Sequence, residues 1–370
     1  MDRRAFVSLA GFGIAAAAFP ADAAAPASIP LAEHAARRGI SFGSAVSQRV
    51  LGDRSYRQLV DHQCDMLVGE NAFKWRHMER RENQREVAEA RWIAAYAQNS
   101  GKRLRGHCFC WNHHDRMPRW LVDKAAGLAP RDHGELTRQM WRHGAFLART
   151  FPDIACWDAM NEAVDPTTGE LRETEFTRLL GEDYVDLSFH IMAERLPSAN
   201  LVYNETMSWE ADPTHRDGVL RVLERALASG VPIHALGIQS HIGKTLGRRR
   251  DERAWRRFLE EVEGMGVDVI LTEFDCSDRN IAARSREQRD AEVAAHVRAY
   301  LDLTLSFTNV RELLVWSLAD GPSYMNRRSY PRRRRRADGL PLRGHPFDQQ
   351  LAAKPMLAAM QGALASAPVR

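Results

Sequence analysis

The 370-residue chain has few cysteines, no long apolar run and no excess of one charge. Five cysteines are too few for the disulfide framework of a small secreted domain. No uninterrupted apolar run reaches the roughly 18 residues of a membrane span, and no internal repeat is found. Lys and Arg number 52 and Asp and Glu 48, and the resulting charge of +4 is too small for a dedicated nucleic-acid-binding protein. We therefore expect neither a nucleic-acid partner nor a membrane anchor.

Apolar residues, by contrast, are abundant. They make up 44% of the chain, and charged residues make up 27%. This composition excludes wholesale disorder, because it can bury a large core. The length would suit two or three average domains, but α/β barrels often exceed 250 residues as one domain.

The first 27 residues have the layout of a bacterial export signal. Arg3 and Arg4 precede an apolar stretch, and small residues follow that offer cleavage sites. The segment 3–7 resembles the twin-arginine pattern, whose cargo crosses the membrane already folded. An ordinary Sec signal and an amphipathic helix are the alternatives. We expect an exported protein, periplasmic or secreted, with residues 1–27 as signal and 28–370 as one domain.

Short apolar runs alternate with amphipathic stretches along the rest of the chain. The runs have four to eight residues rich in Val, Ile and Leu, as buried parallel strands do, and the stretches have helical spacing. Eight such runs favour a closed (β/α)8 TIM barrel, an α/β fold, over an open sheet. The runs are 40–46, 66–69, 104–111, 154–160, 201–204, 236–241, 269–274 and 313–319, and the main helical stretches are 85–99, 133–149, 175–196, 217–229, 253–265 and 287–303.

Polar and aromatic residues close these runs, where the active sites of such barrels form. Glu162 ends the fourth run and Glu273 the seventh, so their carboxylates can meet across the mouth of the barrel. Two such carboxyl groups are what glycoside hydrolysis needs, although metal enzymes and isomerases also use them. The other residues that close runs are Glu70, Asn71, His107, Trp111, Asn161, Asn204, Glu205, Gln239, His241, Asp275, Trp316 and Asp320.

Six motifs around these residues follow one another in a characteristic order. They are Glu70-Asn71-x-x-Lys74-Trp75, Gly106-His107 followed by Trp111, Trp157-Asp158-x-x-Asn161-Glu162-Ala163, Gly237-Ile238-Gln239-Ser240-His241, Leu271-Thr272-Glu273-Phe274-Asp275 and Leu314-Val315-Trp316-x-x-x-Asp320-Gly321. With Phe347-Asp348 and Lys354-Pro355 near the C-terminus, they resemble glycoside hydrolase family 10, the endo-β-1,4-xylanases. The resemblance covers the chain from about Ile40 onward.

The resemblance implies a retaining endo-β-1,4-xylanase that acts as a monomer on xylan or xylo-oligosaccharides, with no cofactor and no metal. Glu162 would be the acid/base and Glu273 the nucleophile, so we expect the surroundings to hold the pKa of Glu162 above that of Glu273. His241 would orient the nucleophile, and Asn161 would donate to the sugar 2-hydroxyl. The other substrate-binding residues implied are Glu70, Asn71, Lys74, His107, Trp111, Gln239, Trp316 and Tyr324.

Three positions depart from the family pattern. Asn112 follows Trp111 where a histidine is usual, Tyr324 stands in for a second tryptophan, and Thr206 ends the segment Asn204-Glu205-Thr206, where the family usually has Asn-Asp-Tyr. We keep Asn112 as a candidate binding residue. The alternatives left open are a β-glucanase-type endo-hydrolase, a carbohydrate-binding protein that has lost turnover, and a metal-dependent barrel hydrolase.

The cysteines and arginines carry two further expectations. Strand alternation would place Cys108 and Cys110 on one face and His107 on the other, which disfavours a zinc site. Buried free thiols are expected, and a pairing with Cys156 stays open. The run Arg332–Arg336 is expected to be a solvated loop, or else to attract the uronic-acid groups of glucuronoxylan.

Overall fold

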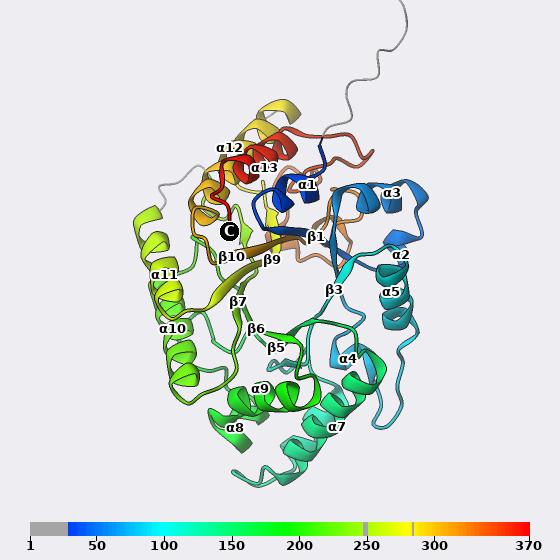
Figure 1. Cartoon of the computed structure of the whole chain (residues 1–370), viewed down its shortest axis with the longest axis vertical. Helices are drawn as coiled ribbons and strands as arrows, with labels where there is room; N and C mark the ends of the chain where they lie inside the picture. Colours follow the sequence, from blue (N-terminus) through cyan, green and yellow to red (C-terminus); the bar gives the residue numbers. More distant parts are fainter. Residues whose placement is uncertain (1–28, 247–250, 283–284) are drawn as a thin grey trace, which may run out of the picture.

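The protein forms a closed barrel of eight parallel strands with helices around it (Figure 1), as the alternating pattern predicts. The structure is a computed structural model that describes residues 29–246, 251–282 and 285–370. The predicted export signal, residues 1–27, lies outside the described residues. The barrel strands are β1 (Ser41–Val46), β2 (Met66–Gly69), β3 (Arg103–Gly106), β5 (Cys156–Asn161), β6 (Asn200–Glu205), β7 (Ala235–Ile238), β9 (Asp268–Cys276) and β10 (Val310–Val315).

The ring closes because β10 pairs in parallel with both β9 and β1. Two short strands, β4 (Cys110–Trp111) and β8 (His241–Ile242), extend it beside β5 and β9. The helices are α1 (Leu31–Ala36), α2 (Gln48–Leu51), α3 (Arg54–Gln63), α4 (Trp75–Met78), α5 (Ala88–Asn99), α6 (Arg119–Ala126), α7 (Gly134–Thr150), α8 (Glu175–Leu180), α9 (Asp183–Arg195), α10 (Pro213–Ala228), α11 (Glu252–Gly264), α12 (Arg286–Thr304) and α13 (Pro355–Ser366), and 3₁₀ turns form η1 (Tyr324–Asn326) and η2 (Arg332–Arg334).

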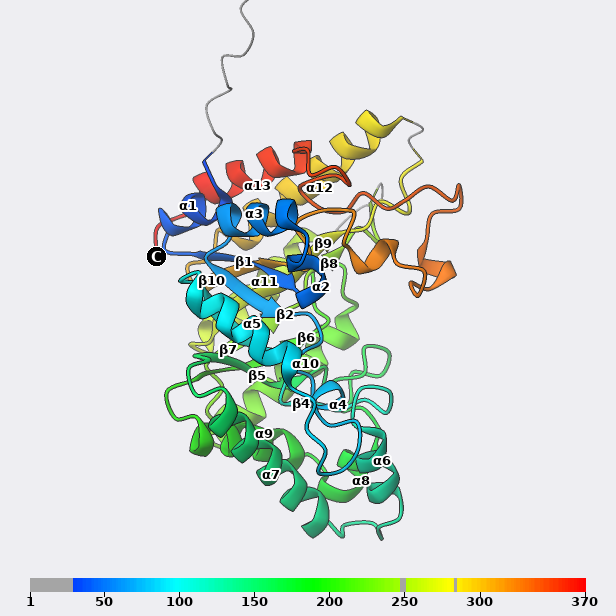
Figure 2. The ribbon, with the colours of Figure 1, turned by 90° about the vertical axis from the view of Figure 1, so that its right-hand side faces the viewer.

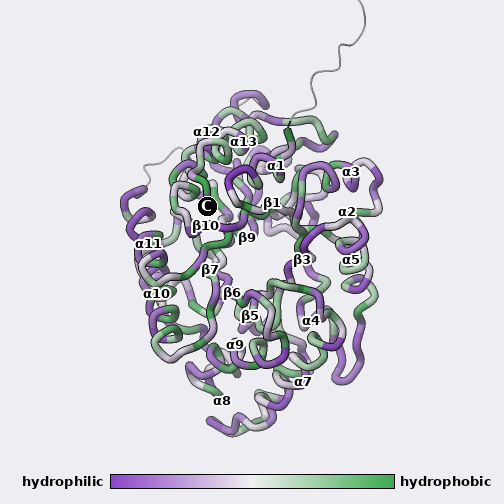
Figure 3. The backbone as a smooth tube through the Cα atoms, in the orientation of Figure 1, coloured by the Kyte–Doolittle hydropathy of each residue, from purple (hydrophilic) through white to green (hydrophobic). Residues whose placement is uncertain are grey.

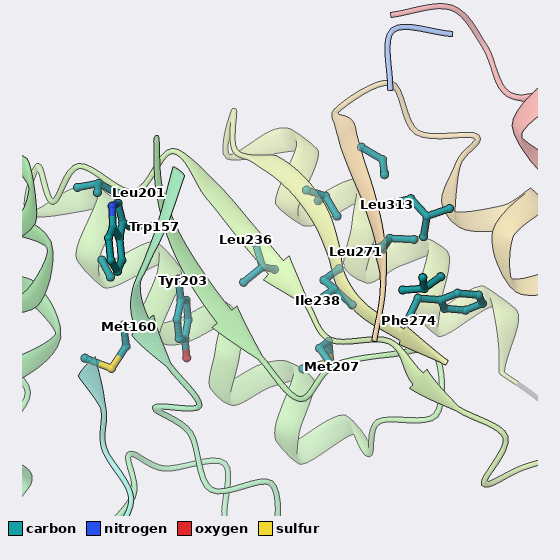
Figure 4. Packing of buried hydrophobic residues seen from close by; sticks show 14 of the residues in the cluster. Trp157, Met160, Leu201, Tyr203, Met207, Leu236, Ile238, Leu271, Phe274 and Leu313 are labelled. Atoms are coloured by element: carbon teal, nitrogen blue, oxygen red, sulfur yellow. The ribbon is translucent and has the colours of Figure 1, made fainter. Parts of the chain in front are cut away.

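Strand side chains alternate between two apolar layers. In β2, Leu67 packs in the large cluster between strands and helices, whereas Met66 and Val68 belong to a smaller cluster formed by strands from around the ring. Figure 4 shows part of the large cluster, with Trp157 and Leu236 on separate strands. Hydrophilic stretches lie on the outward sides of the helices (Figure 3). The core is therefore the two-layered one of a barrel.

The prediction that 104–111 and 236–241 each form a single strand is wrong, because each segment contains two strands. After β3 the chain leaves the ladder, and Phe109 donates its N–H to the Asp158 carbonyl at 2.9 Å before β4 begins. After β7, Ser240 adopts a left-handed φ of 60°, and β8 then starts at His241. The alternation argument for Cys108 and Cys110 therefore fails, because no continuous strand carries them.

Three more features of the fold concern the cysteines, the C-terminus and the lengths of the helices. All five cysteines are free and buried, including Cys108, Cys110 and Cys156. Near the ends of the described chain, the Arg370 N–H donates to the Arg38 carbonyl at 3.0 Å, which joins the C-terminus to the segment after α1. Within the described ranges, no helix is both long and apolar enough to traverse a lipid bilayer.

Candidate active site

Glu162 lies directly after β5, the fourth strand of the barrel. Its backbone is left-handed, with φ of 53°, a conformation that non-glycine residues adopt mainly where function or surrounding contacts require it. Gln239 donates its Nε2 to Glu162 Oε1 at 2.9 Å. Arg172 donates its Nε to the Glu162 carbonyl at 2.8 Å, and its Nη2 lies 3.9 Å from the carboxylate. The backbone and the carboxylate of Glu162 are thus both held from outside its own strand.

Glu273 lies in β9, the seventh strand of the barrel, and its carboxylate is held in the ionised form. Asn204 donates to Oε1 at 3.1 Å, and His241 Nε2 lies 3.4 Å from Oε2. Burial opposes ionisation, but the hydrogen bond from His241 and the nearby charges of His107, His241 and Lys74 outweigh it. The pKa of Glu273 is lowered to about 2, which suits a group that must act as an anion.

His241 is itself held by a carboxylate behind it. Its Nδ1 lies 2.9 Å from Asp275 Oδ2, and the Tyr324 hydroxyl donates to the same oxygen at 3.1 Å. Burial opposes the charge on His241, but Asp275 and Glu273 raise its pKa to about 10. The imidazole is therefore a cation between two acids at neutral pH. Tyr324, predicted as a ring for sugar stacking, thus also orients this group through its hydroxyl.

Asn204 contacts both acids, because its carbonyl accepts the backbone N–H of Glu162 at 2.8 Å and its side chain donates to Glu273. Asn204 Nδ2 donates to Asn161 Oδ1 at 2.8 Å as well as to Glu273, and the Thr272 hydroxyl donates to Asn204 Oδ1 at 2.7 Å. These bonds fix both amides in one orientation. Asn161 Nδ2 is buried with no hydrogen-bond partner among the described residues. An unsatisfied buried donor is costly, so this atom is suited to a hydroxyl of a bound sugar.

A second group of predicted residues gathers beside Glu273. His107 Nδ1 lies 2.6 Å from Asp158 Oδ2, and Asp158 also pairs with Arg105 inside the barrel. The His107 ring lies 6.0 Å from the Trp111 ring and 5.6 Å from the Trp316 ring, between centroids. Two indoles and an imidazole thus surround one side of the site, as the motifs predict.

Lys74 extends over the same two indoles. Its Nζ lies 4.9 Å from the Trp111 centroid and 5.9 Å from that of Trp316, and it donates to Asn71 Oδ1 at 3.0 Å. Burial lowers the pKa of Lys74, although the charge of Glu273 opposes this. Lys74 and Asn71 therefore offer polar atoms next to flat apolar faces, a combination suited to sugar rings.

Glu70 forms an ion pair with an arginine that the motifs did not indicate. Both of its carboxylate oxygens accept from Arg327, at 2.6 and 2.7 Å, in a bidentate pair. Arg327 follows η1, more than 250 residues along the chain. The pair joins the second strand end to the segment after β10, so Glu70 positions this wall of the site besides any contact with a sugar.

A hollow of about 510 Å³ continues from the site beyond His241. Gln239, His241 and Asp275 line it at the site, and Thr206 lies along it. It is further lined by residues of the segment after β10, which Figure 2 shows projecting on the side of the barrel where β8 and α4 lie. The site thus opens into a cleft on the side of Glu273 and His241.

Three strand-end residues are buried in structural contacts. Asn112 is fully buried and accepts from the Thr174 hydroxyl at the start of α8. Glu205 is fully buried and accepts from the Tyr203 hydroxyl at 2.7 Å. Asp320 is buried and pairs with Lys354 at 2.9 Å. These residues support the barrel mouth from behind.

Arg172 and Arg327 are the site residues that the sequence did not indicate. Both lie in connecting segments outside the motif positions, and a lone arginine in such a segment carries no local signal. Asn204 and Asp275 were recognisable as strand-end residues, but the bonds they make depend on strands that are distant in sequence. Within the three described ranges, no group of three or more His, Cys, Asp or Glu side chains could hold a metal ion.

Comparison with known proteins agrees with the motifs. The profile of glycosyl hydrolase family 10 matches residues 30–363. Endo-1,4-beta-xylanase B of Paenibacillus barcinonensis is 28% identical over 343 residues, which cover 88% of this chain and 96% of that protein. Endo-1,4-beta-xylanase 5 of Pyricularia oryzae is 29% identical over 293 residues, covering 77% and 68% of the two chains.

Solved structures share the fold. The xylanase XynB of Paenibacillus barcinonensis, crystallised with a conduramine derivative, superposes with a TM-score of 0.78 at 24% identity and covers 92% of this chain and 100% of its own. Xylanase 10B of Thermotoga petrophila, in complex with xylobiose, gives a TM-score of 0.78 at 22% identity, covering 91% and 97%. These likenesses establish the barrel architecture.

Proposed function

Because the chain belongs to glycosyl hydrolase family 10, we propose that it is a retaining endo-β-1,4-xylanase. Glu162 is the acid/base and Glu273 the nucleophile in this proposal. The observation that carries it is that Gln239 and Asn204 each contact both strand-end acids, Glu162 and Glu273, and that Glu273 is held ionised. A carboxylate pair around one linkage is the arrangement that glycoside hydrolysis uses.

In the first step Glu273 attacks the anomeric carbon, and Glu162 gives its proton to the departing glycosidic oxygen. The new bond is an ester between the sugar and Glu273, and the bond that breaks joins the anomeric carbon to the leaving sugar. His241, a cation beside Glu273, keeps the attacking oxygen ionised and oriented until the bond forms.

In the second step Glu162, now ionised, takes a proton from water. The resulting hydroxide attacks the anomeric carbon from the face that the leaving sugar vacated, and Glu273 departs as a carboxylate. Two inversions give net retention. The unpaired Nδ2 of Asn161 is suited to donate to the sugar 2-hydroxyl, a contact that strengthens as positive charge develops on the ring.

The remaining residues of the site bind the sugar chain in this proposal. Trp111 and Trp316 offer flat faces to pyranose rings, and Lys74 and Asn71 offer donors to hydroxyls on the same side. His107, held by Asp158, donates from a fixed orientation. Xylan or a xylo-oligosaccharide is the substrate that family membership favours.

The test is reducing-sugar release from xylan and from cellulose by purified protein. We expect release from xylan only, and a loss of at least about a thousandfold in kcat for Glu273→Ala on xylan. Release from β-glucan or cellulose in place of xylan would support the β-glucanase reading, and tight binding without release would support a binding protein. Loss of activity in a chelator would indicate a metal-dependent hydrolase.

A second experiment assigns the roles of the two acids. The first anomer that appears in the proton NMR spectrum should have the configuration of the substrate. With an activated aryl xyloside, azide should rescue both variants by filling the cavity left by the carboxylate. Glu273→Ala should then give the inverted glycosyl azide and Glu162→Ala the retained one. The opposite pattern would exchange the two roles.

A further inference from the structure

In the arginine run 332–336, Arg335 and Arg336 anchor the loop, Arg333 and Arg334 line the hollow, and Arg332 is exposed. Arg336 is buried, pairs with Asp338 at 2.6 Å and donates to the Asp278 carbonyl at 2.6 Å. Arg335 turns back and donates to the carbonyls of Tyr330 and Arg328, at 3.0 and 2.6 Å. Both side chains therefore bond to the loop itself, and neither lines the hollow.

Arg333 and Arg334 line the hollow beside His241, and two cations from other segments line it with them. Lys244 follows β8, and Arg279 follows β9 and donates to the Arg333 carbonyl at 3.1 Å. Among the described residues, none of these four cations forms an ion pair with an acid. The expectation of a solvated loop holds for Arg332–Arg335, which are exposed, and only Arg333 and Arg334 line the hollow.

Two of the three acids that line the same hollow already form hydrogen bonds or an ion pair with protein groups. Glu210 accepts from the N–H groups of Gly243, Lys244 and Thr245, at 2.9, 2.8 and 3.1 Å, and so shapes the turn that carries Lys244. Asp275 pairs with His241 and accepts a hydrogen bond from the Tyr324 hydroxyl. Asp212, exposed at the start of α10, is the remaining acid on the rim. The four cations therefore leave an excess of positive charge in this part of the cleft.

We infer that this part of the cleft is a subsite for a carboxylate-bearing branch of the polysaccharide, a uronic-acid residue. Arg333 and Arg334 bind its carboxylate, supported by Arg279 and Lys244. Guanidinium groups match a carboxylate in geometry and charge. Tyr324 and Tyr330 line the same hollow with ring centroids 5.5 Å apart, and they offer apolar surface to the branch ring.

Continuity with the active site identifies the polysaccharide as the carrier of this carboxylate. Gln239 and His241 contact Glu162 and Glu273, and both also line the hollow. A carboxylate in it would therefore be attached to a sugar close to the cleaved linkage. This inference rests on the proposed function.

The test compares glucuronoxylan with the same polymer after reduction of its carboxyl groups. Arg333→Gln/Arg334→Gln should lower the ratio of kcat/KM on the acidic to the reduced polymer by about three- to tenfold. The matched control is Arg328→Gln/Arg332→Gln, which removes two exposed arginines of the same loop that do not line the hollow. The control should keep the ratio of the wild type.

Three outcomes would overturn the subsite. The wild type could show no preference for the acidic polymer, both double variants could lose the preference equally, or the Arg333/Arg334 variant could keep it. Equal loss would indicate general attraction by surface charge. Failure of the wild type to cleave either polymer would instead contradict the proposed function, so the two proposals fail in different ways.

Discussion

At the scale of single residues, the site depends on charges placed close together out of water. Glu273 stays ionised although it is buried, because His241 and Lys74 offset the cost of desolvation. The sequence predicted Glu273, His241 and Lys74, because they lie in recognisable motifs at or after strand ends. It did not predict the ion pair between Glu70 and Arg327, since a barrel pattern does not specify how a long connecting segment folds back.

Replacing His241 by Gln should move the acidic limb of the pH profile. The change removes a cation that lowers the pKa of Glu273, so this pKa should rise from about 2 towards its ordinary value of 4.5. Glu273 would then be protonated, and unable to attack, at a higher pH. We expect the acidic limb of kcat/KM on xylan to shift upward by about one pH unit or more.

The control for this change is His190→Gln, an exposed position in α9, which should leave the limb where it is. A purely structural role for His241 would lower activity equally at every pH. An unshifted acidic limb in the His241→Gln protein would therefore contradict the role given to this histidine.

Arg172→Gln should lower kcat about tenfold, because small misplacements of a reacting group are costly. The Arg172 Nε donates to the carbonyl of Glu162, whose backbone is in the left-handed region. Without this donor the Glu162 backbone is held less firmly and only the bond from Gln239 still fixes the carboxylate, while the sugar-binding residues on the other side of the site are untouched. Steady-state kinetics on xylo-oligosaccharides should therefore show a loss in kcat that exceeds any rise in KM.

Arg138→Gln, at an exposed position in α7, is the control for Arg172. An equal loss of kcat in both variants, or a change confined to KM, would show that Arg172 does not position Glu162.

At the scale of elements, hydrophobic runs located the strands, and local backbone geometry set their ends. The run 66–69 coincides with β2, whereas the run 236–241 contains two strands separated by the left-handed Ser240. A left-handed serine has no signature in an apolar pattern, so this break was not predictable. The helix α3 was also missed, although Asp53 caps it by accepting from the N–H groups of Ser55 and Tyr56.

Gly106→Ala should destabilise the protein by about 2 kcal/mol, because it overpacks the end of β3. A Cβ at Gly106 would lie 2.2 Å from the fully buried Trp157 ring, which has no room to move. Urea unfolding followed by circular dichroism measures the change. Gly134→Ala, where a Cβ meets nothing within 4 Å, is the matched control and should be neutral or stabilising by up to about 1 kcal/mol. Equal stability of the two variants would contradict this packing.

At the scale of the whole molecule, the order of strands determines which residues can meet. The closed ring brings β5 and β9 to facing sides, and it makes neighbours of β1 and β10 from opposite ends of the sequence. Eight alternating units predicted the barrel, and the resemblance of the ordered motifs predicted the family. The path of the segment after β10 was not, because no repeated pattern governs it.

Export is the prediction that concerns the full chain. We propose that residues 1–27 direct the folded protein through the twin-arginine route. Arg3→Lys/Arg4→Lys should keep xylanase activity inside the cells of a Gram-negative bacterial host, whereas Arg80→Lys/Arg81→Lys, at two exposed positions of the barrel domain, should not. Fractionation and a xylan assay measure this. Continued export of the first variant would favour the Sec route.

Gln239, like Asn204, contacts both proposed catalytic acids. Its side chain donates to Glu162, and its carbonyl accepts the backbone N–H of Glu273 at 3.1 Å. The spacing of the attacking and protonating groups therefore depends on the residue that directly follows β7. Loops around the rim can change which branched polymers are admitted while the stereochemical outcome at the sugar stays constant.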